Sequence, residues 1–143
     1  MVILRDDRID LHSVESIIKA RQIVRDCAIM QGFSLVDQTK LVTAASELAR
    51  NTLIHGGGGE MHIEVIIDGA RRGVRATFVD HGPGIPDIDQ AMRDGYTSKG
   101  GLGLGLGGAK RLVNKFAVTS TVGEGTTVTS GDRVDFLPPL SGG

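Results

Sequence analysis

The stretch GGLGLGLGGAK, residues 100–110, carries six glycines between positions 100 and 108. Glycine lets backbone N–H groups approach an anion without a Cβ in the way, and a helix that begins directly afterwards adds unpaired N–H donors. The interleaved leucines disfavour a flexible linker, because apolar side chains are costly to leave in water. The stretch therefore predicts a loop that closes over the phosphates of a nucleotide.

The same glycines admit another interpretation, because residues 103–108 match G-x-G-x-x-G, the fingerprint of dinucleotide sites. That fingerprint follows a strand directly and has an acidic ribose partner about 20 residues further on. Here residues 94–99 precede it, and Glu124, the nearest acid downstream, falls in a predicted turn. The Walker pattern is absent, since neither Lys99 nor Lys110 follows a glycine. A dinucleotide-dependent oxidoreductase remains an alternative that depends on this match alone.

Glu47 and Asn51 lie four residues apart in a predicted helix and therefore share one face. The side-chain oxygen of Asn51 suits Mg²⁺, a hard ion that prefers oxygen ligands, and Glu47 could accept a proton from a hydroxyl nucleophile or orient it. In isolation the pair also fits an ordinary solvated helix face. Its interpretation therefore depends on the other motifs.

Asp80 comes at the end of the predicted apolar strand 74–79 and is followed by Gly82 and Gly84. A carboxylate in this position can accept a hydrogen bond from an adenine amino group, while the glycines let the backbone pack against the base. The alternative is an ordinary turn of aspartate and glycine. The sequence alone leaves both open.

The elements around these motifs indicate an α+β fold, in which helices cover one face of a mixed, mostly antiparallel sheet. Apolar residues at three- and four-residue steps predict helices, and short alternating runs joined by turn residues predict hairpins. The expected elements are a short strand at 4–9, a helix from about Ser13 to Gly32, a helix from Ser34 or Asp37 to the glycine run 56–59, strands at 61–67 and 74–79, a short helix at 88–94, a helix at 108–116, a hairpin of 117–122 with 126–130, and a strand at 134–136.

Composition limits the possible functions. The chain has 143 residues, 40% of them hydrophobic, and a formal net charge of -1, which fits one globular domain and argues against nucleic acid as the main partner. Cys27, the single cysteine, lies among apolar residues and is expected to be a buried thiol. No apolar run approaches the ~20 residues of a membrane span, and the N-terminus lacks the features of a signal peptide. We expect a cytoplasmic protein that has no membrane partner.

Taken in order, four motifs resemble the N, G1, G2 and glycine-threonine boxes of the GHKL ATPases and kinases, which share the Bergerat fold. They are E-x-x-x-N on a helix, D-x-G-x-G-I after a strand, a G-x-G-x-G loop before a helix, and GEGTTVT. The resemblance covers about residues 10–129 and implies a single domain over 1–143, a two-layer sandwich. SELARNTLIHGGGGE and GLGLGLGGAKRLVNKF resemble the anti-sigma-factor serine/threonine kinases, most closely the RsbT-type switch kinases of bacterial stressosomes. Residues 130–143 depart from that pattern, as a further strand or a tail.

The resemblance implies ATP and Mg²⁺ as cofactors and gives each motif a role. Asn51 would ligate Mg²⁺, and Glu47 would activate or orient the attacking hydroxyl as the catalytic residue. Asp80 would read the adenine amino group, supported by Thr127 or, as a close second, by Thr126. The expected nucleotide-binding residues are Asn51, Asp80, Gly82, Gly84, Ile85, Lys99, Gly101, Leu102, Gly103, Leu104, Gly105, Thr126 and Thr127.

The resemblance also implies partner proteins. The substrate would be a serine or threonine of a STAS-domain antagonist protein, and the released kinase would bind and activate a PP2C-type phosphatase. A nucleotide-dependent regulator that sequesters its partner without catalysis is the alternative function. The roles of Arg50, His55 and Lys110 stay open between phosphate, partner and surface contacts.

Overall fold

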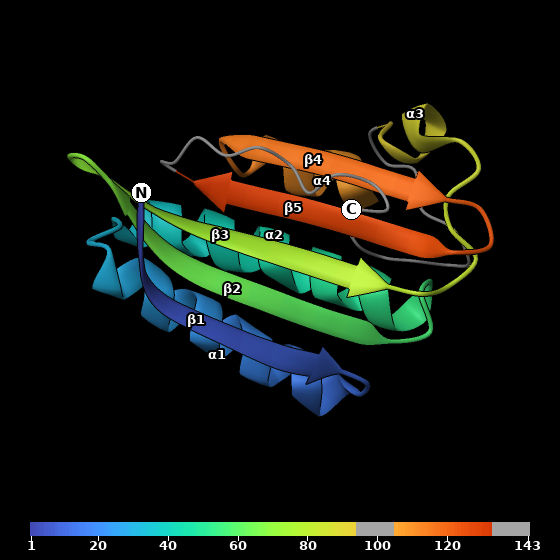
Figure 1. The fold of residues 1–143 in the computed structure, drawn as a ribbon, viewed down its shortest axis with the longest axis horizontal. Coiled ribbons are helices and arrows are strands. Elements are labelled where there is room, and N and C mark those ends of the chain that lie inside the picture. The colour runs from blue at the N-terminus through green and yellow to red at the C-terminus, as the bar shows by residue number, and fades with distance from the viewer. Residues whose placement is uncertain (94–104, 133–143) are drawn as a thin grey trace.

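The computed structural model describes residues 1–93 and 105–132 (Figure 1). Its strands form one sheet, and α1, α2 and α4 lie behind that sheet in Figure 1, on the same face, whereas the short α3 lies beyond the sheet edge near the end of β4. In chain order the elements are β1 (Val2–Leu11), α1 (Val14–Met30), α2 (Leu35–Ile54), β2 (Gly59–Asp68), β3 (Arg71–Asp80), α3 (Ile88–Ala91), α4 (Gly105–Arg111), β4 (Lys115–Thr121) and β5 (Gly125–Asp132).

The strand order in the sheet is β1-β2-β3-β5-β4, and each of the pairings among the described strands is antiparallel. The predicted α+β fold with helices on one face is therefore confirmed. β5 lies between β3 and β4, so the last described strand pairs with the strand that ends at Asp80. This order brings the G1-like and glycine-threonine motifs to neighbouring strands.

Serine residues cap both long helices, as their sequence predicts. The side chain of Ser13 accepts a hydrogen bond from the N–H of Ser16, and that of Ser34 accepts one from the N–H of Asp37. At the other end of α1, the side-chain amide of Gln31 donates to backbone carbonyls of β2 and β3, which fixes the helix to the sheet. Of the helices in the described part of the chain, none is both long and apolar enough to cross a membrane.

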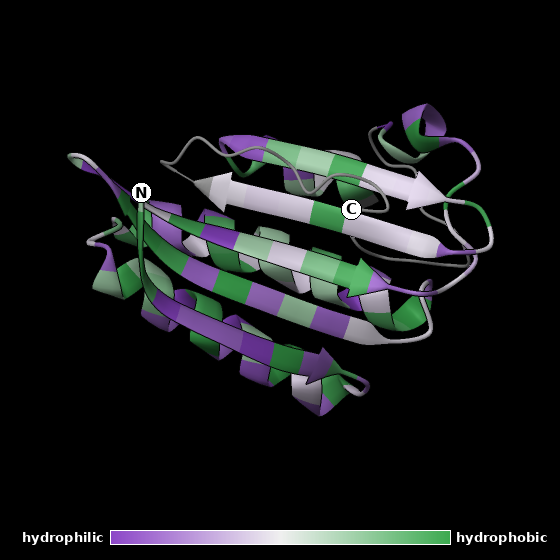
Figure 2. Cartoon of the chain, viewed as in Figure 1, coloured by the Kyte–Doolittle hydropathy of each residue, from purple (hydrophilic) through white to green (hydrophobic). Residues whose placement is uncertain are grey.

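The core lies between the helices and the sheet. α2 contributes its buried face, and β2 and β3 contribute alternate residues, so that hydrophobic and hydrophilic residues alternate along these strands in Figure 2. Burying one large apolar side chain stabilises the fold by roughly 1.5–3 kcal/mol. The largest fully buried side chains include Leu11, Leu41, Leu48, Met61, Ile63 and Phe78.

Several expected boundaries differ in the structure, most clearly those of α4 and β2. The helix predicted at 108–116 is α4, which begins and ends earlier, and Phe116 lies in β4, from which it packs against the core. The N–H groups of Leu112 and Val113 bond to carbonyls three residues back, which closes the helix with a tighter turn. β2 starts inside the predicted glycine turn, because Gly59 pairs with both β1 and β3. The strand expected at 134–136 lies outside the described residues.

Cys27 gives a test of the core. Its side chain is fully buried, and burial raises the pKa of the thiol from 9.0 to about 11, because the thiolate would lose its hydration. A shift of this size lowers the thiolate fraction at pH 8 by about 100-fold. We expect a thiol reagent such as DTNB to react at least about 100-fold more slowly with the folded protein than with the protein unfolded in guanidinium. Similar rates in the two states would contradict the buried position.

Candidate functional site

The candidate catalytic and metal-binding residues of α2 lie toward its C-terminal end. Glu47 and Asn51 share a helix face, and the backbone carbonyl of Asn51 accepts the N–H groups of His55 and Gly56 at 2.9 and 3.2 Å. The Glu47 side chain is 13% exposed, and its Oε1 lies 4.0 Å from Nη1 of Arg50. The carboxylate is therefore mostly shielded from water, with a cation on the next turn.

Asp80, the last residue of β3, is held by backbone donors. Its Oδ1 accepts the N–H of Gly82 at 3.0 Å and the N–H of Thr126, the second residue of β5, at 3.2 Å. Hydrogen bonds to a carboxylate are stronger than those between neutral groups, so this oxygen is firmly placed. Within the described residues no donor bonds to Oδ2, which leaves that oxygen able to accept a hydrogen bond from a ligand.

Glycines pack directly against Asp80. A Cβ on Gly56 would overlap the Asp80 carboxyl group, and a Cβ on Gly125 would overlap the Asp80 backbone carbonyl. A Cβ on Gly82 would lie 2.8 Å from the carbonyl oxygen of Gly56. Because the N–H of Gly56 also bonds to Asn51, this close packing brings the end of α2 to the end of β3 (Figure 1).

The loop 81–87 docks on the β4–β5 hairpin. The N–H of Gly123 donates to the carbonyl of Pro83 at 2.8 Å, and the N–H of Ile85 donates to Ser120 Oγ at 2.7 Å. Gly84 has φ +80, a left-handed conformation in which a side chain would be strained. The predicted G1-like glycines therefore lie between the end of β3 and the last hairpin.

Thr126 and Thr127 are placed differently. Thr126 is buried, donates its N–H to Asp80, and has its hydroxyl 2.8 Å from that of Ser120. Thr127 pairs with Val79 across the β3–β5 ladder, so its side chain points to the other face of the sheet. The geometry therefore favours Thr126 as the residue that supports Asp80.

The predicted phosphate loop is described only at its end. Gly105 is the first residue of α4, whereas Lys99 and residues 101–104 lie outside the described residues. Leu106 and Ala109 are buried, and α4 lies against α2. The motif thus leads into a helix, as predicted, and the roles of its glycines stay predictions.

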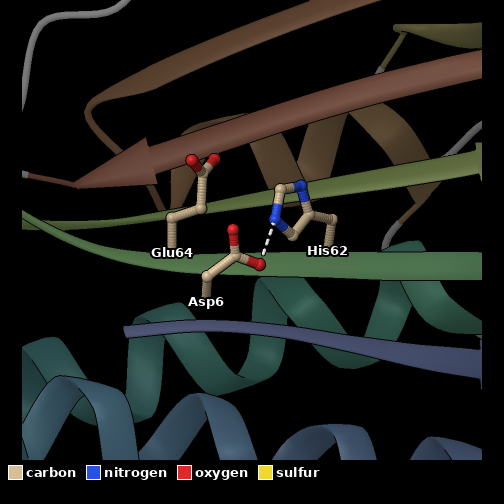
Figure 3. Close-up of side chains that lie close together, drawn as sticks. All are labelled: Asp6, His62 and Glu64. Atoms are coloured by element: carbon tan, nitrogen blue, oxygen red, sulfur yellow. Dashed lines mark hydrogen bonds and ion pairs between the residues drawn. The ribbon is translucent and has the colours of Figure 1, made fainter. Parts of the chain in front are cut away.

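A second group of possible metal ligands lies elsewhere, on the sheet face opposite the helices. Asp6, His62 and Glu64 place one ligand atom each within 4.8 Å of one another (Figure 3). However, Nε2 of His62 is 2.5 Å from Oδ1 of Asp6, and both Glu64 oxygens accept hydrogen bonds from Arg75 at 2.8 and 2.9 Å. Protein partners already occupy these atoms, so we interpret the group as a polar network that joins β1, β2 and β3.

Sequence patterns do not predict how three residues of this region contact the Asp80 segment. Gly56 and Gly125 fall in predicted turns within the motifs, and Ser120 falls in a predicted strand. Their contacts with Asp80 and its loop join segments far apart in the chain, so no local pattern marks them. For Gly125 the sequence signal is its place in the motif GEGTTVT.

Comparison with known proteins identifies the family. Residues 36–140 match the family of histidine kinase-, DNA gyrase B-, and HSP90-like ATPases, and the chain therefore belongs to this family. The sequence-based assignment to the GHKL superfamily is confirmed. A crystal structure of the RsbU and RsbW domains of Rv1364c from Mycobacterium tuberculosis has a similar fold, with a TM-score of 0.62 and 21% identity over 90% of this chain and 32% of that one.

Within the family, the chain is similar to a bacterial serine/threonine-protein kinase and to bacterial anti-sigma factors. It is 46% identical to serine/threonine-protein kinase RsbT of Bacillus subtilis, over 78% of this chain and 84% of that protein. It is 34% identical to the anti-sigma F factor of Anoxybacillus flavithermus, over 66% of this chain and 68% of that protein. The expectation of a serine/threonine kinase related to anti-sigma factors is supported by these relatives.

Gly125→Ala tests the packing around Asp80. The residue has φ +123, so alanine costs about 1–3 kcal/mol of backbone strain in addition to the overlap with the Asp80 carbonyl. We expect a clear loss of thermal stability and at least a tenfold loss of ATP affinity in calorimetric titration.

Gly69→Ala is the matched control, because Gly69 has φ +63 but open space around it, in the β2–β3 turn. We expect it to cost about 1 kcal/mol of stability and to leave ATP affinity unchanged. Equal ATP affinity in the two variants would contradict the placement of Gly125 beside the site.

Proposed function

We propose that this chain is an ATP-dependent serine/threonine protein kinase of a bacterial partner-switching pathway. The observation that carries the proposal is the Asp80 carboxylate, held at one oxygen by two backbone N–H groups beside the helix end that bears Glu47 and Asn51. Similarity to serine/threonine-protein kinase RsbT supports it. The proposal gives each of these three polar side chains a separate task.

Asp80 binds the adenine. Its Oδ2 accepts a hydrogen bond from the 6-amino group, while Oδ1 stays bonded to the backbone. The loop residues Gly82, Gly84 and Ile85 form one side of the base pocket. Thr126 supports Asp80 from β5, through the hydrogen bond from its backbone N–H to Oδ1. Recognition of the amino group distinguishes ATP from GTP, because a guanine presents a carbonyl at that position, which a carboxylate repels.

Asn51 is the metal ligand. It is half-buried on the last turns of α2 and offers a neutral oxygen, which fits Mg²⁺, an ion held in many phosphate sites by one or two protein oxygens, the substrate phosphates and water. An ion held by Asn51 would neutralise charge on the polyphosphate. Lys99 and residues 101–104 lie outside the described residues, and their role at the phosphates is proposed from residue type alone: glycines leave backbone N–H groups accessible to an anion.

Glu47 acts on the attacking hydroxyl. A bond forms between the hydroxyl oxygen of the substrate serine or threonine and the γ-phosphorus, and the bond from that phosphorus to the β–γ bridging oxygen breaks, which releases ADP. Glu47 orients the hydroxyl and accepts its proton. Nη1 of Arg50 lies 4.0 Å from Oε1 of Glu47, so the two side chains are close enough for Arg50 to help orient the carboxylate.

The substrate is a STAS-domain antagonist, and the released kinase activates a PP2C-type phosphatase by binding it. Similarity to RsbT and to anti-sigma F factors supports a role in partner switching. A regulator that only binds nucleotide and sequesters a partner is the alternative function. Glu47 favours catalysis, because sequestration needs no proton acceptor beside the metal ligand.

Glu47→Gln and Asn51→Ala separate binding from transfer. We expect Glu47→Gln to bind Mg-ATP normally but to lower phosphoryl transfer by about 100-fold or more, because the proton acceptor is lost. Asn51→Ala should lose productive Mg-ATP binding. Transfer is measured with radiolabelled ATP and candidate STAS-domain proteins, and the modified residue is mapped by mass spectrometry.

Glu15→Gln is the control for this pair, since it makes the same change at an exposed acid on α1 and should leave both measurements unchanged. Full transfer activity in Asn51→Ala would refute the proposed metal ligand. Normal transfer in Glu47→Gln would instead favour the regulatory alternative or another base.

A thermal-shift titration distinguishes ATP from dinucleotides. A ligand that binds only the folded state raises the unfolding temperature as its concentration exceeds the Kd. We expect ATP with Mg²⁺ to stabilise the protein and NAD to have no effect at the same concentration. Stabilisation by NAD alone would overturn the proposed function.

A further inference from the structure

The hydroxyl of Ser120 has three polar neighbours from two other segments. Ser120 lies in β4, opposite Thr126 of β5. Its Oγ accepts the N–H of Ile85 at 2.7 Å and lies 3.2 Å from the carbonyl oxygen of Gly125 and 2.8 Å from Oγ1 of Thr126. A hydroxyl has one proton and two lone pairs, so all three contacts can be hydrogen bonds if the Thr126 hydroxyl donates to Ser120.

These contacts join the two segments that hold Asp80. Ile85 belongs to the loop whose Gly82 donates to Asp80 Oδ1, and Thr126 donates its own backbone N–H to the same oxygen. Ser120 does not touch Asp80 itself in any hydrogen bond described by the structure. Ser120 connects the 81–87 loop, which precedes β4 in the sequence, to the start of β5, which follows β4.

We propose that Ser120 is a positioning residue of the nucleotide site, which fixes the direction of the Asp80 carboxylate by joining the 81–87 loop to the start of β5. This inference rests on the proposed function, in which Asp80 Oδ2 accepts the adenine amino group. Without the hydroxyl, the N–H of Ile85 loses its partner, and both donors to Oδ1 become free to shift. A carboxylate that samples several directions recognises the amino group less well.

Ser130 provides a matched control. It lies in β5 on the same sheet face as Thr126, two positions beyond Val128, and its buried Oγ has no hydrogen-bond partner within the described residues. Ser130→Ala therefore removes the same atom from the same sheet without breaking a hydrogen bond of the structure. Any effect common to both variants reflects loss of a strand hydroxyl and not the bond to Ile85.

The experiment compares two nucleotides in calorimetric titration with Mg²⁺. One is ATP, and the other is purine riboside triphosphate, which lacks the 6-amino group. We expect wild type and Ser130→Ala to prefer ATP clearly. In Ser120→Ala we expect the Kd for ATP to rise about tenfold, a difference of about 1.4 kcal/mol, while the Kd for the purine analogue changes little. The ratio of the Kd for the purine analogue to the Kd for ATP, which measures the preference for ATP, then falls toward one.

Three outcomes would contradict either the role of Ser120 or the proposed function. If Ser120→Ala keeps both the ATP affinity and the preference of wild type, the inference is wrong, although the proposed function stands. If Ser120→Ala weakens both nucleotides equally, Ser120 has only a structural role, and the inference is again wrong. If wild type and Ser130→Ala bind no ATP, the proposed function itself fails. Unfolding temperatures recorded for all three proteins ensure that each is folded during the titration.

Discussion

The carboxylate of Asp80 accepts two backbone hydrogen bonds at one oxygen, and one of the donors, Thr126, is 46 residues away. This interaction requires β5 to lie beside β3, which the strand order provides by placing β5 inside the sheet and β4 at its edge. It also requires glycine at positions 56 and 125, where a Cβ would overlap Asp80. The strand order and these two glycines are therefore both needed for the backbone to bind the Asp80 carboxylate in this way.

Much of the fold follows from local sequence patterns. The serine caps, the apolar steps of α1 and α2, and the two hairpins each depend on residues close together in the chain, and the structure has them. The boundaries of α4 and β4 were predicted less well, because Phe116 continues an apolar helical pattern but packs against the core from a strand. There, tertiary packing outweighs local propensity.

The site is predictable only in part for a similar reason. Asp80 and the Glu47–Asn51 pair stand out because their residue types and spacing suggest chemistry. The support of Asp80 cannot be found in this way, since Ser120 bonds to a residue 35 positions away, and strand serines are common. The choice between Thr126 and Thr127 depends on which sheet face each side chain takes, and a shift of one residue in register would exchange them.

Among the described strands β4 lies at the edge, and there the β4–β5 hairpin pairs with the rest of the sheet through β3. A hairpin at an edge can detach by sub-global opening while β1, α1, α2, β2 and β3 keep their mutual packing. Opening would remove the Thr126 donor and the Ser120 bond together, so a nucleotide would bind only the closed form. By linkage, occupancy of the site would then slow amide hydrogen exchange in the hairpin more than in the strands at the far edge.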